Sequence, residues 1–88
     1  MTESIGDLRN LGPKSVQMLK QAGIATPDRL KQLGSVDAFI LVQRTGAKPT
    51  LNLLWALEGA ICNKRWQDIA HEQRRVLLDR LDARRTEM

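Results

Sequence analysis

The sequence predicts an all-α fold, a single compact domain of five to six short helices. Apolar residues recur at helical spacings of three and four, and no stretch alternates polar with apolar residues as a strand would. Glycine and proline divide these patterns into short segments. Because 88 residues can bury one hydrophobic core but not two, one domain is expected over residues 5–85. Residues 1–4 and 86–88 are expected to be short flexible ends.

The first helix is expected over residues 13–22. Proline suits its first position, because the missing N–H group would have no helical partner there. Val16, Leu19 and Ala22 follow the helical spacing and form its apolar side. Gly23 suits the left-handed residue that closes a helix.

Two more short helices and one earlier turn are expected in the first half of the chain. Residues 5–9 can form a single helical turn. Thr26 offers a side-chain oxygen that caps a second helix, and Gly34 ends this helix. Ser35 then caps a third helix, which continues to about Thr45.

Residues 50–62 are the most apolar part of the chain, and they predict a helix that is buried on most sides. A loop over residues 46–50 precedes this helix, because Pro49 disfavours the helical conformation at Lys48. Gly59 is small enough to let a neighbouring helix approach closely.

The C-terminal part of the chain predicts one further helix. Asn63 suits the end of the preceding helix, and a turn over residues 64–67 is expected to fold Trp66 back onto the core. The last helix is expected over residues 71–84, with polar residues on its solvent side. Its buried residues are expected to be Val76, Leu77 and Leu81.

The charge balance is mildly basic. The chain holds 14 Lys and Arg residues against 10 Asp and Glu residues, a formal net charge of +4. The excess lies in residues 1–34 and 64–88. Such a balance is compatible with a nucleic-acid or acidic partner, and equally with an ordinary solvated surface.

Three features predict a cytoplasmic protein without membrane contact. The single cysteine, Cys62, excludes an intrachain disulfide and suits a reducing compartment. The most apolar segment is too short to span a bilayer, and no apolar leader follows a basic start.

The residue patterns of an enzyme are missing from the sequence. The only histidine, His71, is expected at the surface near a helix start, and Cys62 is expected to be a small filler of the core. The sequence contains no phosphate-binding P-loop, no dinucleotide-binding glycine motif and no Cys/His metal spacing. We therefore expect no catalytic residue, no cofactor and no metal.

The two tryptophans have two interpretations. Trp55 and Trp66 are candidate platforms on which nucleic-acid bases stack. Both lie beside apolar stripes, so packing in the core is the favoured interpretation. The arginines of the last helix similarly favour a solvated helix face over a track for phosphates.

The stretch Leu11-Gly12-Pro13-Lys14-Ser15 is a candidate phosphate site. It opens the first helix, where free backbone N–H groups and the positive end of the helix dipole favour an anion. Lys14 stands beside these groups. The alternative is an ordinary helix start that joins two packed helices.

Five motifs follow one another along the chain: Arg9-Asn10-Leu11-Gly12-Pro13-Lys14-Ser15, Ala22-Gly23-Ile24, Leu33-Gly34, Leu51-Asn52-Leu53-Leu54-Trp55-Ala56-Leu57-Glu58-Gly59-Ala60 and Trp66. In their order and spacing, residues 8–81 resemble the C-terminal domain of the TfoX/Sxy family of competence regulators. Residues 11–30 also resemble a helix-hairpin-helix element with a SAM-like arrangement. They are similar to the part of the bacterial RNA polymerase alpha chain that contacts DNA, which lies in the C-terminal domain of that chain.

The resemblance implies a compact helical domain with a helix-hairpin-helix-like part. It also implies a link to DNA-uptake genes through transcriptional co-activation, with a promoter-bound regulator as the partner. Full-length family members carry an N-terminal α/β domain that these 88 residues do not contain. The first glycine position of the usual DNA-binding hairpin, Gly-x-Gly, is occupied here by Asn10 or Leu11.

We therefore expect a small non-enzymatic binding module. It would contact double-stranded DNA through phosphates, with low sequence specificity, or contact a DNA-bound transcription regulator. The candidate DNA-binding residues have three expected roles. Gly12, Lys14 and Ser15 would present hydrogen-bond donors. Arg9 and Lys20 would flank them as cations, and Asn10 would read the minor groove.

The alternative is a protein–protein adaptor or a homodimer without direct DNA contact. In that case the apolar helix or the basic C-terminal tail would dock the partner. A contiguous exposed patch that included Leu51, Trp55 or Leu78 would favour this alternative.

Overall fold

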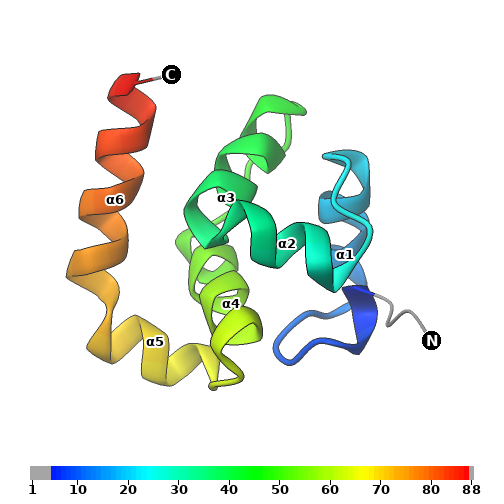
Figure 1. The fold of residues 1–88 in the computed structure, drawn as a ribbon, viewed down its shortest axis with the longest axis horizontal. Helices are drawn as coiled ribbons and strands as arrows, with labels where there is room; N and C mark the ends of the chain where they lie inside the picture. The colour runs from blue at the N-terminus through cyan, green and yellow to red at the C-terminus, as the bar shows by residue number, and fades with distance from the viewer. Residues whose placement is uncertain (1–4, 88) are drawn as a thin grey trace.

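The computed structural model describes residues 5–87 and confirms the all-α fold (Figure 1). Within these residues the chain forms one 3-10 turn and six helices and no strand, so the predicted number of helices is right. The predicted flexible ends at residues 1–4 and at Met88 lie outside the described residues. The elements are η1 (Ile5–Asp7), α1 (Pro13–Gln21), α2 (Pro27–Leu33), α3 (Ser35–Arg44), α4 (Leu51–Cys62), α5 (Trp66–Glu72) and α6 (Arg74–Glu87).

The core is built around α3 and α4, which pack against each other at the centre of the molecule (Figure 1). Helix α4 also packs against α2 and α5, while α3 packs against α1 and α6. As predicted, α4 ends at Asn63, which has a left-handed conformation with φ of 57°. No helix in the described part of the chain is long and apolar enough to cross a membrane. The largest fully buried side chains are Phe39, Ile5, Leu19, Ile24, Leu30, Leu54, Leu57, Ile69, Leu77 and Val42.

Helix α1 begins at Pro13 and ends as the sequence predicts. Gly23 has a φ of 83°, and its N–H donates to the Lys20 carbonyl at 3.0 Å. The N–H of Ile24 donates to the Leu19 carbonyl at 2.8 Å. This pair of bonds is the Schellman motif, in which an apolar residue after the glycine packs against the last turn of the helix. Leu19 and Ile24 are both fully buried, so the motif turns the chain from α1 towards α2.

The predicted cap of α2 is confirmed, and the predicted cap of α3 is wrong. The side-chain oxygen of Thr26 accepts a hydrogen bond from the Arg29 N–H at 3.2 Å. Gly34, with a φ of 83°, precedes α3, and Ser35 is already the first helical residue. The buried Ser35 hydroxyl donates to Oε1 of Glu58 at 2.8 Å, so it links α3 to α4 instead of capping its own helix.

The connection between α4 and α5 is shorter than predicted. Only Lys64 and Arg65 lie between Asn63 and the start of α5, and Trp66 is the first residue of that helix. The prediction that Trp66 folds back onto the core is wrong, because 37% of the residue is exposed.

The single helix predicted over residues 71–84 corresponds mostly to α6, and a further helix, α5, covers residues 66–72, most of which were not predicted to be helical. The two helices meet at Gln73, which has a non-helical φ of −120°. Leu77 and Leu81 are buried, whereas Val76, predicted to be buried, is 48% exposed. Adjacent residues of a helix point about 100° apart, so a narrow contact that buries Leu77 leaves Val76 in solvent.

Polar contacts hold the C-terminal part of α6 against α3. Nε of Arg84 lies 2.8 Å from Oδ1 of Asp37, in a half-buried ion pair. Nη2 of Arg85 donates to Oε1 of Gln43 at 2.9 Å. As a result α6 stands alongside α3, on the side of the molecule away from α1 (Figure 1).

Candidate nucleic-acid interface

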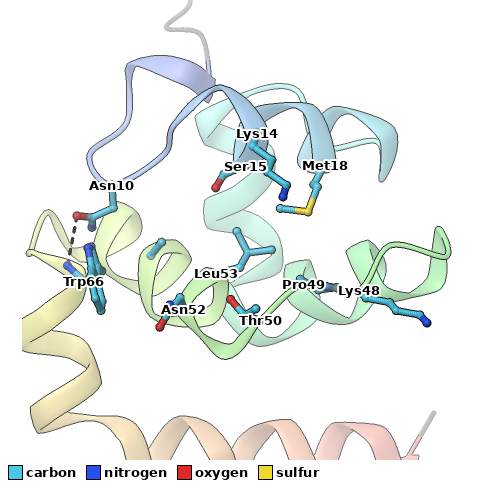
Figure 2. Close-up of a pocket in the computed structure, with 11 residues that line it drawn as sticks. Asn10, Lys14, Ser15, Met18, Lys48, Pro49, Thr50, Asn52, Leu53 and Trp66 are labelled. Atoms are coloured by element: carbon cyan, nitrogen blue, oxygen red, sulfur yellow. Dashed lines mark hydrogen bonds between the residues drawn. The ribbon is translucent and has the colours of Figure 1, made fainter.

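An open cleft of about 380 Å³ lies between α1 and the beginning of α4 (Figure 2). In Figure 2, Asn10 and the first two turns of α1 face it from one side. The loop before α4, the first turns of α4 and Trp66 face it from the other side. The residues that line the cleft are Asn10, Lys14, Ser15, Met18, Lys48, Pro49, Thr50, Asn52, Leu53, Ala56 and Trp66.

The lining residues give the cleft a positive charge. Lys14 reaches it from α1 and Lys48 from the loop before α4, while none of the described residues that line it carries a carboxylate. Both lysines are exposed. Counter-ions or an anionic ligand are therefore attracted to this face of the molecule.

The starts of two helices border the cleft. Gly12 precedes α1 and Thr50 precedes α4, and in the described structure no side chain at either position caps the first turn of its helix. The N-terminal N–H groups of a helix have no intrahelical partner, and the helix dipole adds a partial positive charge there. Both effects reinforce the charge of the two lysines.

Asn10 connects this cleft to the loop between α4 and α5. Its Nδ2 donates to the Lys64 carbonyl at 2.7 Å, and its Oδ1 accepts a hydrogen bond from the Trp66 N–H at 3.2 Å (Figure 2). Asn10 also has a φ of 72°, in the left-handed region that glycine adopts most readily and that asparagine tolerates. An asparagine therefore takes the conformation of the usual glycine here, and its amide adds two long-range hydrogen bonds. We call this group of contacts between Asn10, Gly59, Lys64 and Trp66 the Asn10 junction.

Gly59 makes the Asn10 junction sterically feasible. A Cβ atom at this position would lie only 2.5 Å from the Lys64 carbonyl oxygen, and it would also overlap Nδ2 of Asn10. The Lys64 N–H donates to the Gly59 carbonyl at 2.8 Å. Gly59 was expected to admit a neighbouring helix, but it is a loop carbonyl and a side-chain amide that approach it.

The predicted DNA-binding residues are only partly brought together. Lys14 and Ser15 line the cleft, whereas Gly12 is exposed and precedes them at the start of α1 without being one of the lining residues. Arg9 is exposed nearby, with its Nη1 3.5 Å from the Asn63 carbonyl oxygen. Lys20 lies away from the cleft, beside a shallow hollow on another face of α1.

The amide of Asn10 is engaged in the Asn10 junction, so its predicted contact with a minor groove would require two internal hydrogen bonds to break. Asn10 thus positions the turn before α1 against the loop after α4. Reading of DNA by Asn10 stays a prediction.

Sequence reasoning did not single out Lys48 or Asn52 as site residues, and it favoured core packing for Trp66. These residues reach the cleft from a loop and from two helices that are distant from α1 in the chain. One signal was present in the sequence, since Lys48-Pro49 predicts an extended loop immediately before a helix. The spatial contact of that loop with α1 has no signature in a single sequence.

Positive charges continue along the α4–α5 loop. Arg65 makes two hydrogen bonds of 3.2 Å to the Asp68 carboxylate. These bonds lower the pKa of Asp68, and the charges of Arg65, Arg9 and Lys64 lower it further. The Asp68 carboxylate therefore lies in the field of three cations.

Cys62 and His71 give no sign of catalytic chemistry. Cys62 was expected in the core but is exposed, and its Sγ lies 3.3 Å from Oε2 of Glu58. Partial desolvation raises the pKa of the Cys62 thiol, and the hydrogen bond and charge of Glu58 raise it further, unlike a reactive thiolate. His71 is exposed, as predicted. Within residues 5–87, no three His, Cys, Asp or Glu side chains are placed to share a metal ion.

The patch that would favour an adaptor is not formed by the residues named for it. Trp55 is 4% exposed, Leu78 is half-buried, and only Leu51 is exposed, at 37%. The large exposed apolar residues of the described chain are Leu51, Trp66 and Val76.

The fold and the Asn10 junction define a small all-α domain in which a tight N-terminal turn is fixed against a central helix. Residues 1–81 match the family model described as "TfoX C-terminal domain". The chain therefore belongs to the TfoX C-terminal domain family, and the predicted family is confirmed.

One curated relative is the "DNA transformation protein TfoX" of Haemophilus influenzae (strain ATCC 51907 / DSM 11121 / KW20 / Rd). The two sequences are 30% identical over 76 residues, which cover 86% of this chain and 35% of the relative. The chain thus spans about a third of the length of that protein.

Two crystal structures from Listeria monocytogenes have the same fold. One is described as an uncharacterized protein in a triclinic form, the other as a protein of unknown function in a tetragonal form. Each is 33% identical to this chain with a TM-score of 0.78, and each match covers 85% of this chain. The matches cover 85% and 93% of the two chains, respectively.

Proposed function

We propose that this domain is a non-enzymatic, cytoplasmic binding module in the regulation of competence and DNA-uptake genes, and that it contacts duplex DNA through the phosphates. The observation that carries the proposal is the cleft with Lys14 and Lys48 and no carboxylate among its described lining residues. The relative described as a DNA transformation protein supports a role connected with DNA.

The proposed contact is made by the turn before α1. Gly12 has no side chain to keep a phosphate away, and a Cβ atom there would meet no other atom within 4 Å. A phosphate at this point accepts hydrogen bonds from the backbone N–H groups of Lys14 and Ser15, and the side chain of Lys14 neutralises its charge. Such contacts are independent of base sequence.

A binding titration with duplex DNA tests this proposal. Affinity is expected to fall steeply as the salt concentration rises from about 50 to about 200 mM, because each neutralised phosphate releases counter-ions. Lys14→Ala should weaken binding about five- to ten-fold near 0.1 M salt and reduce the salt slope by about 1. These changes should be the same for unrelated duplex sequences.

Lys31→Ala is the matched control, because Lys31 is also an exposed lysine but lies on α2 and does not line the cleft. This variant should bind as the unaltered protein does. The proposal is wrong if no complex forms at low salt, or if the two variants weaken binding equally.

A further inference from the structure

Trp66 is a partly exposed aromatic residue at one end of the cleft. It is 37% exposed, whereas the other tryptophan, Trp55, is 4% exposed and packs in the core. The backbone N–H of Trp66 donates to Oδ1 of Asn10, and Trp66 is the first residue of α5. Both features fix the backbone of Trp66. Burial of a tryptophan ring is strongly favourable. A tryptophan that stays partly exposed therefore offers a surface that a ligand can cover.

The remaining apolar surface of the cleft is small. Leu53 and Ala56 line it but are only 5% and 6% exposed, and Met18 and Pro49 are half-buried. An aliphatic anchor of a peptide would therefore find little apolar surface to cover, whereas a flat ring can stack on Trp66. The cleft volume of about 380 Å³ lies within the range of small-ligand sites, about 300–1,000 Å³.

Charged and polar groups extend from Trp66 along the cleft. In the view of Figure 2, Trp66 lies at the end beside Asn10, Lys14 lies further along on the α1 side, and Lys48 lies towards the opposite end. The side chains of Thr50 and Asn52 lie between Trp66 and Lys48 (Figure 2). An aromatic platform followed by lysines and hydrogen-bonding groups matches the alternation of base and phosphate along a nucleic-acid strand.

From this arrangement we infer that the cleft binds an unpaired nucleotide of single-stranded DNA, with its base stacked on Trp66 and the adjoining phosphates near Lys14 and Lys48. A base inside a duplex has both faces covered by its neighbours, so only an unpaired base can stack on a side chain. The inference rests on the proposed DNA contact and extends it to a strand end, bubble or single strand.

Fluorescence anisotropy with a labelled oligothymidine of about ten nucleotides and with a labelled duplex measures the two kinds of binding separately. Stacking of one base on an aromatic ring commonly changes affinity about ten-fold or more. Trp66→Ala should therefore weaken oligothymidine binding about ten-fold and leave duplex binding within about two-fold. Trp66→Phe keeps a ring and should recover part of the lost affinity. An oligouridine of equal length distinguishes DNA from RNA as the source of the unpaired nucleotide.

Leu51→Ala is the matched control, because Leu51 is also an apolar residue with 37% exposure but does not line the cleft. It should bind oligothymidine normally. Circular dichroism melting of each variant shows whether the fold is retained.

In a Trp55→Phe protein, Trp66 is the only tryptophan, and oligothymidine should quench its fluorescence in a saturable manner. If the core substitution of Trp55 prevents folding, the anisotropy comparison still tests the inference.

The outcomes separate this inference from the proposed function. If duplex DNA binds in a Lys14-dependent way but Trp66→Ala leaves oligothymidine binding unchanged, the stacking inference is wrong and the duplex contact stands. If neither DNA binds, both are wrong. The inference is also overturned if an acidic peptide displaces oligothymidine and quenches Trp66 equally well, because the cleft is then a peptide site.

Discussion

At the scale of single residues, Asn10 and Gly59 depend on each other. Asn10 adopts a left-handed conformation and places its amide against the Lys64 carbonyl, directly over the Cα of Gly59. Any side chain at position 59 would occupy the space of that amide and of the carbonyl. The cleft keeps its shape because the turn before α1 and the loop after α4 are held at this one point.

Gly59→Ala should destabilise the protein by about 2 kcal/mol, through overpacking against the loop backbone and loss of the hydrogen bonds of Asn10. Helix propensity alone would favour alanine by about 1 kcal/mol, so a net loss identifies the close approach as the dominant effect. Urea unfolding followed by circular dichroism measures the difference.

Gly12→Ala is the control for that measurement. Gly12 has a φ of −88°, and its added Cβ would meet no atom within 4 Å. The Gly12→Ala variant should lose no more than about 1 kcal/mol of stability, the usual cost of alanine at a helix N-cap. Equal effects of the two substitutions would contradict the role given to Gly59.

Residue-level predictions succeeded where the signal was local and failed where a distant segment decided the outcome. Gly23 and Thr26 were placed correctly, because a helix stop and a helix cap depend on neighbouring residues. Ser35 carries the same capping signal, but Glu58 of another helix accepts its hydroxyl. Cys62 was expected in the core because its helix is apolar, yet it lies at the exposed end of that helix.

At the scale of elements, α6 is attached to the rest of the fold through a narrow face. Leu77 and Leu81 are its buried apolar residues among those described, and the pair between Arg84 and Asp37 adds a half-buried contact. Charged side chains occupy most of its other positions, and a helix of this length is marginal on its own in water. The stability of α6 therefore depends on its contact with α3.

Leu77→Ala should lower the free energy of unfolding by about 2–4 kcal/mol, because it removes a fully buried side chain and leaves a cavity. The neighbouring Val76→Ala should change it by less than about 0.5 kcal/mol, since Val76 is largely solvated. Chemical denaturation of both variants measures the contrast. A similar loss in both would show that α6 packs with a different face.

The division between α5 and α6 could not be predicted from the sequence. Gln73 separates them, although neither glycine nor proline marks that position and glutamine is compatible with a helix interior. Ile69 of α5 and Leu77 of α6 are both buried. The chain changes direction at Gln73 because the two helices must run in different directions to bury both residues. Tertiary packing thus overrides local propensity at this point.

At the scale of the whole molecule, the fold class was predictable and the cleft was not. Helical spacing, caps and glycine stops specify α1 to α4 and most of α6, because each signal lies within one segment, whereas α5 was not predicted. The cleft combines residue 10, the start of α1, the loop before α4 and the start of α5. Its components are separated by up to 56 residues, and single-sequence patterns contain no information about that proximity.

The Asn10 junction also bears on the order in which the chain folds. It joins residues 54 and 56 positions apart, so a long loop must close before its hydrogen bonds form. The helices and their short connections can form earlier, so we expect the junction to close after the transition state. Asn10→Ala should consequently accelerate unfolding several-fold and leave the refolding rate nearly unchanged, as stopped-flow kinetics in denaturant would measure. A refolding rate that falls as much as the unfolding rate rises would instead place the junction in the folding nucleus. We therefore expect the cleft, which depends on this junction, to form late in folding and to open before the core does.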